Sequence, residues 1–385
     1  MPPEEQSERL ASRLICSRTG ETAALDEPEF LSPVGAPWLV EYDLANADGR
    51  ALAEAWRRRS WTMWRYRELL PHRDDARRVS LGEGGTPLVQ VRRLFGADID
   101  ALFKQEAGNP TGSFKDRGLS MAVNRARELG ARGVELASAG NAALALTAYA
   151  AACGMPARVA LPEDAPEGIV RRCREHGAEV LVAGRNLVEA GKRLAEQDGD
   201  YWNVSTLKEP YRVEGKKTLG LEIAEQLGWQ LPDWILYPTG GGTGIVGMQR
   251  AFDQLETLGL VSGPRPRFVA VQMEGCAPII RAFDAGAESA EPWPNPKTSV
   301  WGLRVPQAIG DFLILSALRS SGGRAIAVAE EAITGMVARA AREEGLRLGP
   351  EGAACCLALD RLIEEGAVKA GERVVVFQTG HPDNY

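Results

Sequence analysis

The sequence lacks the features that would place it in a membrane, on nucleic acid or outside the cell. Across its 385 residues, no run approaches the roughly 18 consecutive apolar residues of a membrane-spanning helix. The first ten residues, MPPEEQSERL, are acidic where a signal peptide would be basic and then apolar. The 45 Lys and Arg residues are outnumbered by 52 Asp and Glu, so a net charge of -7 offers no general attraction to nucleic acid or an anionic membrane. We therefore expect a cytoplasmic protein with neither as a partner.

Cysteine is scarce as well, and it follows no regular spacing: the positions are 16, 153, 173, 276, 355 and 356. Small secreted domains need dense, patterned cysteines for a disulfide framework, so we expect none here. Most of the cysteines lie in apolar segments such as GAACCLAL. In such surroundings a free thiol is an ordinary core residue.

The composition that remains is that of a globular protein, with 44% hydrophobic and 25% charged residues and enough length for two domains. After about residue 99, short apolar runs alternate with helical stretches, which predicts α/β sheets covered by helices on both faces. Gly154 and Gly177 are expected to end two of the helices. The expected strands are 101–104, 134–139, 157–162, 178–183, 233–238, 267–272, 325–329 and 373–379.

The chain before residue 78 is irregular and contains scattered prolines. It then carries Trp56, Trp61, Trp64 and Tyr66 among arginines. Because Trp and Tyr dominate packing contacts, this stretch predicts a helical arm packed on the core.

The most informative segment is GNPTGSFKDRG, at 108–118. Its proline and glycines predict a tight turn, and Ser113 is placed to cap a helix whose first turn carries Lys115. The positive end of the helix dipole and any burial both disfavour the ammonium form, which prepares this amine to attack a carbonyl. The pattern favours a Schiff-base lysine, while an ordinary solvated lysine beside Asp116 and Arg117 is the alternative.

A second segment, PTGGGTGIVG at 238–247, follows an apolar strand and precedes a helix. Its glycines allow backbone N–H groups to converge on a phosphate at the helix N-terminus. The alternative, a flexible linker, rarely lies between a buried strand and an apolar helix. Residues 242–247 also match G-x-G-x-x-G, but the acidic residue that a dinucleotide site needs about 20 positions on comes late, at Glu274.

Two further strand ends carry polar side chains. SAGN at 138–141 presents Ser138 and Asn141 either to a ligand or as caps of the following helix. VVVFQTGH at 374–381 places Thr379 at the exit of a buried strand, where its hydroxyl could meet a ring nitrogen. Because ligands of such sheets bind outside the carboxyl ends of the strands, these segments predict one shared site.

In this order, GNPTGSFKDRG, SAGNAA, PTGGGTG and FQTGH resemble the pyridoxal-phosphate enzymes of the tryptophan-synthase-β fold type, and the threonine synthases most closely. LGEGGTPLV, EPYRVEGKKT, GLRVPQAIGD and GPEGAA support that narrower likeness. The resemblance implies two lobes, each a three-layer αβα open twisted sheet, with an N-terminal arm. The implied parts are an arm with a degenerate zinc-ribbon-like segment at 1–78, a large cofactor-binding domain at 79–125 with 213–385, and a small mobile domain at 126–212.

Carried over residue by residue, the resemblance implies pyridoxal 5'-phosphate as the cofactor, bound to Lys115 through a Schiff base. Asn141 would form a hydrogen bond with the hydroxyl of the cofactor ring, and Thr379 would face the pyridine nitrogen. A neutral hydroxyl there gives a weaker electron sink than a carboxylate, which favours elimination and replacement over transamination. Ser138 would bind the substrate and Arg212 its phosphate. The residues implied to hold the cofactor phosphate are Gly240, Gly241, Gly242, Thr243 and Gly244.

The implied reaction is that of a carbon–oxygen lyase acting on phosphates, in a homodimer. It converts a small-molecule amino acid, O-phospho-L-homoserine, and water to L-threonine and phosphate, with Lys115 moving protons. Another enzyme of the same fold is the alternative, such as a threonine or serine ammonia-lyase or a cysteate-synthase-like enzyme. A nicotinamide dehydrogenase built around Gly242 and Gly247 would leave GNPTGSFKDRG unexplained. A non-catalytic relative would normally have lost the lysine.

Three departures from the family pattern stand out. Of the four cysteine positions in two N-terminal knuckles that the family often has, only Cys16 remains, so we expect no structural zinc. Ala139 and Ala142 stand where many threonine synthases have hydroxyl residues, which leaves the substrate open. After TGH the sequence reads PDNY, where the family usually has Gly-Leu-Lys.

Overall fold

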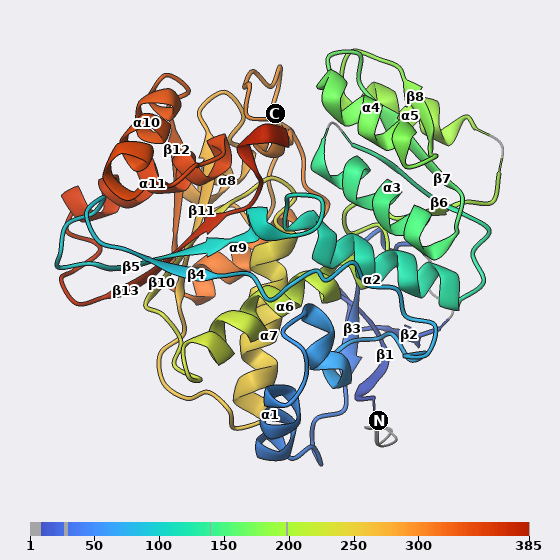
Figure 1. Ribbon diagram of the computed structural model, residues 1–385, viewed down its shortest axis with the longest axis horizontal. Coiled ribbons are helices and arrows are strands. Elements are labelled where there is room, and N and C mark those ends of the chain that lie inside the picture. The colour runs from blue at the N-terminus through green and yellow to red at the C-terminus, as the bar shows by residue number, and fades with distance from the viewer. Residues whose placement is uncertain (1–8, 27–29, 139, 198, 385) are drawn as a thin grey trace.

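The computed structural model of the protein describes residues 9–26, 30–138, 140–197 and 199–384. Within this part the strands form sheets of three, six and four strands (Figure 1). The strands are β1 (Ala11–Cys16), β2 (Thr22–Ala24), β3 (Trp38–Tyr42), β4 (Leu88–Val91), β5 (Asp100–Gln105), β6 (Val134–Ala137), β7 (Ala157–Leu161), β8 (Glu179–Val182), β9 (Trp202–Asn203), β10 (Trp234–Pro238), β11 (Arg267–Met273), β12 (Arg324–Val328) and β13 (Arg373–Gln378).

Helices connect most of these strands. The α-helices are α1 (Gly49–Arg57), α2 (Lys115–Glu128), α3 (Asn141–Cys153), α4 (Glu167–Glu175), α5 (Leu187–Ala195), α6 (Tyr211–Gln226), α7 (Thr243–Thr257), α8 (Pro278–Asp284), α9 (Asp311–Ser320), α10 (Ala332–Glu344) and α11 (Pro350–Glu364). Short 3-10 helices are η1 (Met63–Leu69), η2 (Glu106–Gly108), η3 (Trp301–Leu303) and η4 (Pro382–Asn384).

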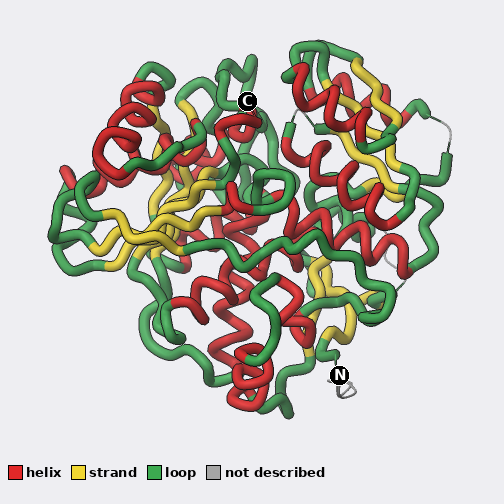
Figure 2. Tube along the Cα trace, in the orientation of Figure 1, coloured by secondary structure: helices red, strands yellow, loops and turns green. Residues whose placement is uncertain are grey.

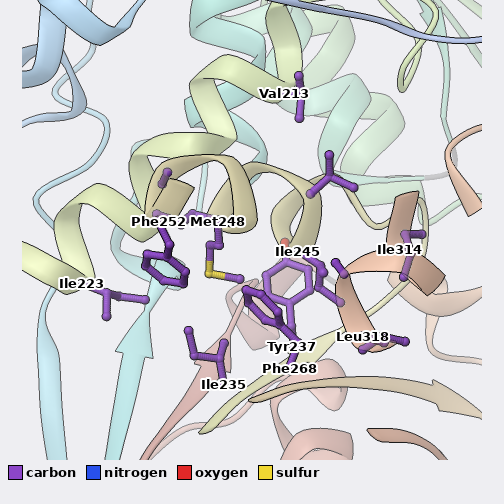
Figure 3. Packing of buried hydrophobic residues seen from close by; sticks show 14 of the residues in the cluster. Val213, Ile223, Ile235, Tyr237, Ile245, Met248, Phe252, Phe268, Ile314 and Leu318 are labelled. Carbon is purple, nitrogen blue, oxygen red and sulfur yellow. The ribbon is translucent and has the colours of Figure 1, made fainter. Parts of the chain in front are cut away.

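The six-stranded sheet has the order β12-β11-β10-β13-β5-β4, and only its edge strand β4 runs antiparallel to its neighbour. Its strands are apolar on both faces because each face is covered. Along β10, Ile235 and Tyr237 enter a core shared with helices α6 to α9, whereas Trp234 and Leu236 enter a second core under α10 and α11. Figure 2 shows these strands between helices, and Figure 3 shows Tyr237 packed in the first core near Ile245.

The four-stranded sheet, with the order β8-β7-β6-β9, is parallel throughout. Val134 and Val159 pack with α2, α3 and α4 on one face, and Ala160 packs with Ala190 and Leu194 of α5 on the other. Both sheets are thus three-layered, as an α/β fold of open sheets requires. The four strands fall inside the segment 126–212; the boundaries of the small mobile domain and of the large domain stay predictions.

All eight expected strands are present, with ends shifted by a few residues. Helix α3 ends at Gly154, which has a φ of 65°, the left-handed conformation that favours glycine. Gly177, with a φ of 80°, follows helix α4 in the same way. The expected cap at Ser113 differs in detail: Phe114 occupies the cap position of α2, and Ser113 Oγ accepts a hydrogen bond from the backbone N–H of Lys115 at 3.3 Å.

The helical description of the N-terminal arm is incomplete. α1 and η1 are present, but the antiparallel sheet β2-β1-β3 precedes them. The sequence did not predict this sheet because its strands are short and of mixed polarity. At the end of β1 the Cys16 thiol donates to Ser32 Oγ at 3.2 Å, which joins the segments 16–20 and 31–35. In the described ranges no three His, Cys, Asp or Glu side chains gather as metal ligands do. The same ranges contain no helix with the length and apolar character needed to span a bilayer.

Candidate active site

A cavity of about 640 Å³ lies where the predicted segments meet, between residues of the six-stranded and four-stranded sheets. This volume is within the range of small-molecule sites. Almost every predicted site residue lines the cavity: Lys115, Ser138, Asn141, Gly240, Gly241, Gly242, Thr243, Arg212 and Thr379. Gly244 is not part of the lining, and a Cβ placed on it would lie 2.2 Å from the Tyr237 hydroxyl. Ala139 lies outside the described residues, whereas Ala142 lines the cavity.

Lys115 is the first residue of α2, and its Nζ lies 4.0 Å from the centroid of the Phe114 ring. Burial, together with the nearby charge of Arg212, lowers the pKa of this amine to about 7, against a smaller opposing effect of Glu351. Lys115 itself is half-buried, whereas its neighbours Asp116 and Arg117 are completely buried, which favours the Schiff-base lysine over an ordinary solvated one. At neutral pH a large fraction of Lys115 therefore carries the lone pair that attack on a carbonyl requires.

The loop before Lys115 is held by the chain that leaves β13. Phe114 donates its backbone N–H to the carbonyl of Thr379 at 2.9 Å, and His381 donates its own to the carbonyl of Gly112 at 2.7 Å. Behind the loop, Arg117 Nη2 binds Glu106 Oε1 at 2.7 Å, fully buried. Bonds on both sides of the lysine thus fix its backbone, which pre-positions the amine.

The glycine segment lies between the end of β10 and the start of α7, so its backbone N–H groups occur at a helix N-terminus. Gly242 has a φ of 71°, which disfavours any residue with a side chain. A Cβ on Gly240 would lie 2.6 Å from the carbonyl oxygen of Gly302, and one on Gly241 would lie 2.9 Å from Cγ2 of Thr206. Side chains would therefore fill this part of the cavity, and their absence leaves a cradle suited to a phosphate.

Gly242→Ala is expected to weaken cofactor binding roughly 10- to 100-fold, because a strained backbone at one residue costs about 1–3 kcal/mol. The added Cβ would lie 2.0 Å from Cδ1 of Ile314. Titration of the apo-protein with pyridoxal phosphate, followed by absorbance, measures the change. Gly335→Ala is the matched control, since a Cβ there meets nothing within 4 Å. Equal affinities for both variants would contradict a phosphate-binding role of this loop.

The remaining polar groups lie at the carboxyl ends of strands. Ser138 follows β6, and its Oγ accepts the backbone N–H of Gly140 at 3.2 Å. Asn141 opens α3, and Asn384 Nδ2 donates to its Oδ1 at 2.9 Å. Thr379 follows β13 and is 4% exposed.

Arg212 opens α6 with Tyr211, and its side chain is 3% exposed. Its Nη1 donates to the carbonyl of Val204 at 2.8 Å, and burial lowers its pKa to about 10. Among the described residues its Nε has no hydrogen-bond partner. A buried guanidinium that lines the cavity is well suited to an anionic ligand.

Other charged residues of the cavity escaped the sequence reasoning. Glu351, 2% exposed, accepts the backbone N–H of Gly302 at 3.2 Å and contributes to the charge around Lys115. The GPEGAA match could have identified Glu351, because Pro350 begins a helix and Glu351 follows in its first turn. Lys192, Lys208 and Arg304 also line the cavity; Arg304 belongs to the GLRVPQAIGD match, and no quoted motif includes Lys192 or Lys208.

Comparison with known proteins agrees with this geometry. Residues 79–380 match the family model described as pyridoxal-phosphate dependent enzyme. The threonine synthase of Methanocaldococcus jannaschii is 36% identical over 95% of this chain and 91% of its own length. That of Methanosarcina acetivorans is 38% identical over 83% of this chain and 79% of its own length. The chain belongs to the threonine synthase family of pyridoxal-phosphate dependent enzymes.

Solved structures support the fold. The processed form of threonine deaminase isoform 2 from Solanum lycopersicum has a TM-score of 0.66 and 24% identity, covering 77% of this chain and 83% of its own. Maize serine racemase has a TM-score of 0.65 and 23% identity, covering 78% and 88%. The family membership excludes the dehydrogenase interpretation of residues 242–247, and it makes the protein a pyridoxal-phosphate-dependent lyase.

The residues of the cavity fit this cofactor. A half-buried lysine with a lowered pKa can bond its aldehyde, and the side-chain-free Gly240–Gly242 turn at the start of α7 can hold its phosphate. Thr379, which follows β13 and lines the cavity, offers a neutral hydroxyl rather than a carboxylate. Bound pyridoxal phosphate supplies an electron sink for negative charge at the substrate α-carbon.

The rate at which the apo-protein takes up the cofactor is expected to rise with pH and level off above about pH 7. The reason is that Lys115, with a pKa of about 7, is mostly neutral above that value and protonated below it. Stopped-flow absorbance measures the rate, and Nα-acetyl-lysine, whose amine has a pKa of about 10.4, is the control for titration of the cofactor itself. A rate that still rises in parallel with the control would contradict the lowered pKa.

Proposed function

We propose that the lyase reaction is the conversion of O-phospho-L-homoserine and water to L-threonine and phosphate. The observation that carries the proposal is the convergence of Lys115, the glycine segment and the buried Arg212 on one cavity. The first two suit the cofactor, and the third suits a second anion. The likeness to curated threonine synthases over most of the chain supports the same reaction.

The charge of the cavity favours a phosphorylated amino acid as the substrate. Within the described chain, its charged lining consists of a single carboxylate, Glu351, and of the basic residues Lys115, Lys192, Lys208, Arg212 and Arg304. An ammonia-lyase acting on threonine or serine has no anionic leaving group to hold. The excess of positive charge therefore fits a substrate with both a carboxylate and a phosphate.

In this proposal each residue acts at a stated group. Lys115 would hold the cofactor and give it up to the substrate amine; its freed amine would take the α-proton and help to move a β-proton, so that phosphate leaves from the γ-carbon and water adds at the β-carbon. Arg212 would hold that phosphate, and Ser138 would bind the substrate. Asn141 would form a hydrogen bond with the oxygen of the cofactor ring. Thr379 would face the ring nitrogen, and Gly240–Thr243 with Gly244 would hold the cofactor phosphate.

Closure of the segment 126–212 over the cavity belongs to the proposal, because it would exclude water until the addition step. Val188 and Lys192 of α5 line the cavity from that segment. Asp164 of the same segment pairs with Arg304 of the opposite side at 3.0 Å. These contacts support a small lobe that meets the large one at the mouth of the cavity.

The experiment that tests the reaction is an assay of the cofactor-saturated protein with O-phospho-L-homoserine, in which phosphate and amino acids are both quantified. Threonine and phosphate in equal amounts are expected. Absence of both, together with 2-oxo acid formed from threonine or serine, would replace the proposal with an ammonia-lyase. One observation favours the ammonia-lyase: Ala142 lines the cavity at a position where many threonine synthases have a hydroxyl residue.

Assembly and location complete the proposal. A homodimer is what the family likeness implies, and light scattering of the holoenzyme measures it; a monomer would contradict it. All six cysteines are free and buried, which supports a reducing compartment and hence the cytoplasm.

A further inference from the structure

Asn384 lies in the chain segment that follows β13 and connects three parts of the molecule. Its side chain is 7% exposed. Its Nδ2 donates to the carbonyl oxygens of Thr111 at 3.1 Å and Gly112 at 3.4 Å, and to Oδ1 of Asn141 at 2.9 Å. Its Oδ1 accepts from Nη1 of Arg172 at 2.8 Å. Figure 1 shows this last segment beside the part of the chain that contains α3 and α4.

The chemistry of these neighbours determines which way the Asn384 amide points. A guanidinium can only donate, so the atom facing Arg172 must be the oxygen. Backbone carbonyls can only accept, so the atom facing Thr111 and Gly112 must be the nitrogen. Neither assignment depends on Asn141, and both give the same orientation.

That orientation in turn determines the amide of Asn141. Because Asn384 presents N–H groups, Asn141 must turn its acceptor, Oδ1, toward Asn384. The donor end of the amide, Nδ2, then points away from Asn384. Asn141 is one of the residues that line the cavity. A donor is what an anionic ring oxygen of the cofactor needs, whereas the opposite orientation would place a carbonyl oxygen against it.

We propose that Asn384 is a positioning residue, which orients the Asn141 amide so that its N–H end serves the oxygen on the cofactor ring. The proposal rests on the role of Asn141 in the proposed function. Asn384 also binds the loop that precedes Lys115, through Thr111 and Gly112, so one side chain sets the position of both cofactor contacts.

Asn384→Asp tests the proposal, because the carboxylate keeps the size and the Arg172 contact but removes the N–H donors. The Asn141 amide would turn to donate to the new carboxylate and so present its oxygen to the cofactor. We expect cofactor affinity to fall roughly tenfold or more, as for loss of a hydrogen bond to a charged group. The pH titration of the absorbance of the Lys115-bound cofactor should shift by about one unit.

Two controls isolate the donor function. Asp383→Asn changes charge in the same turn, but its exposed side chain pairs with Arg347, so affinity and absorbance should stay unchanged. Arg172→Ala leaves the carbonyls of Thr111 and Gly112, which still require the amide nitrogen of Asn384 to face them. Its effect on cofactor affinity should therefore be several-fold smaller than that of Asn384→Asp. Thermal unfolding reports whether each variant is folded. Asn384→Ala, which removes the donors without adding charge, replaces the carboxylate variant if that one does not fold.

Asn141→Ala and the double variant Asn141→Ala/Asn384→Asp decide whether Asn384 acts through Asn141. We expect Asn384→Asp to shift the absorbance titration in the native background and not in Asn141→Ala. A shift of equal size in both backgrounds, or no shift in a folded Asn384→Asp, would overturn the positioning role. If Asn141→Ala itself left the titration unchanged, the role of Asn141 in the proposed function would fail first. The threonine assay tests the reaction separately.

Discussion

Lys115→Ala is expected to lower turnover roughly a thousandfold or more, the combined effect of losing the covalent anchor and the proton-transfer group. The loss follows from the position of the amine, which lines the cavity with a pKa of about 7. The same variant should lack the lysine-bound absorbance and yield no reduced lysine adduct after borohydride treatment. Phosphate and threonine release, with the cofactor in excess, measure turnover.

Lys115→Arg is the companion variant, because it keeps a long basic side chain in the cavity but cannot form a Schiff base. Both variants should retain the fold, since Arg117 and its partners Glu106 and Glu222 hold α2 without using the lysine. Turnover by Lys115→Arg within about tenfold of the native protein would contradict covalent attachment at this position.

The parts of the site that the sequence predicts are those with local signatures. Continuous apolar runs identified the buried strands, and the turn chemistry after them identified the segments around Lys115, Ser138, Gly240 and Thr379. Parallel strands place their carboxyl ends at one edge, so the convergence of the segments after β5, β10 and β13 followed from the topology of the six-stranded sheet; Ser138 joins them from the four-stranded sheet through the packing of the two sheets. The structure brings all four residues to one cavity.

What the sequence could not provide depends on contacts between distant segments. In the antiparallel sheet at the N-terminus, β1 and β2 are short and lack an apolar pattern, and the apolar part of β3 is confined to Trp38, Leu39 and Val40, so no periodicity marks the sheet. Lys192 joins the cavity only because α5 packs beside it, whereas Glu351 of α11 had a signal in the GPEGAA match. Asn384 reads as an ordinary loop residue, and its bonds to Asn141 and Arg172 span 243 and 212 residues of sequence.

Arg212→Ala is expected to reduce kcat/KM for O-phospho-L-homoserine roughly 100- to 1000-fold while leaving cofactor binding nearly intact. Truncating one partner of a buried charge-assisted contact costs about 2–5 kcal/mol, which corresponds to such a loss. The variant also removes a positive charge that lowers the pKa of Lys115, so cofactor uptake should need a higher pH. Steady-state kinetics and the uptake rate measured against pH follow these two effects separately.

Arg212→Lys separates charge from geometry, because lysine keeps the charge but cannot bind a phosphate through two parallel N–H groups. Its kcat/KM should lie between those of the native protein and the alanine variant, and its uptake profile should stay near that of the native protein. Inhibition by inorganic phosphate should weaken in the order native, lysine, alanine. The absorbance change on binding L-threonine, which has no phosphate, should be much less affected. If phosphate inhibited Arg212→Ala as strongly as the native protein, the arginine would have another role, and the case for a phosphorylated substrate would rest on Lys192, Lys208 and Arg304 alone.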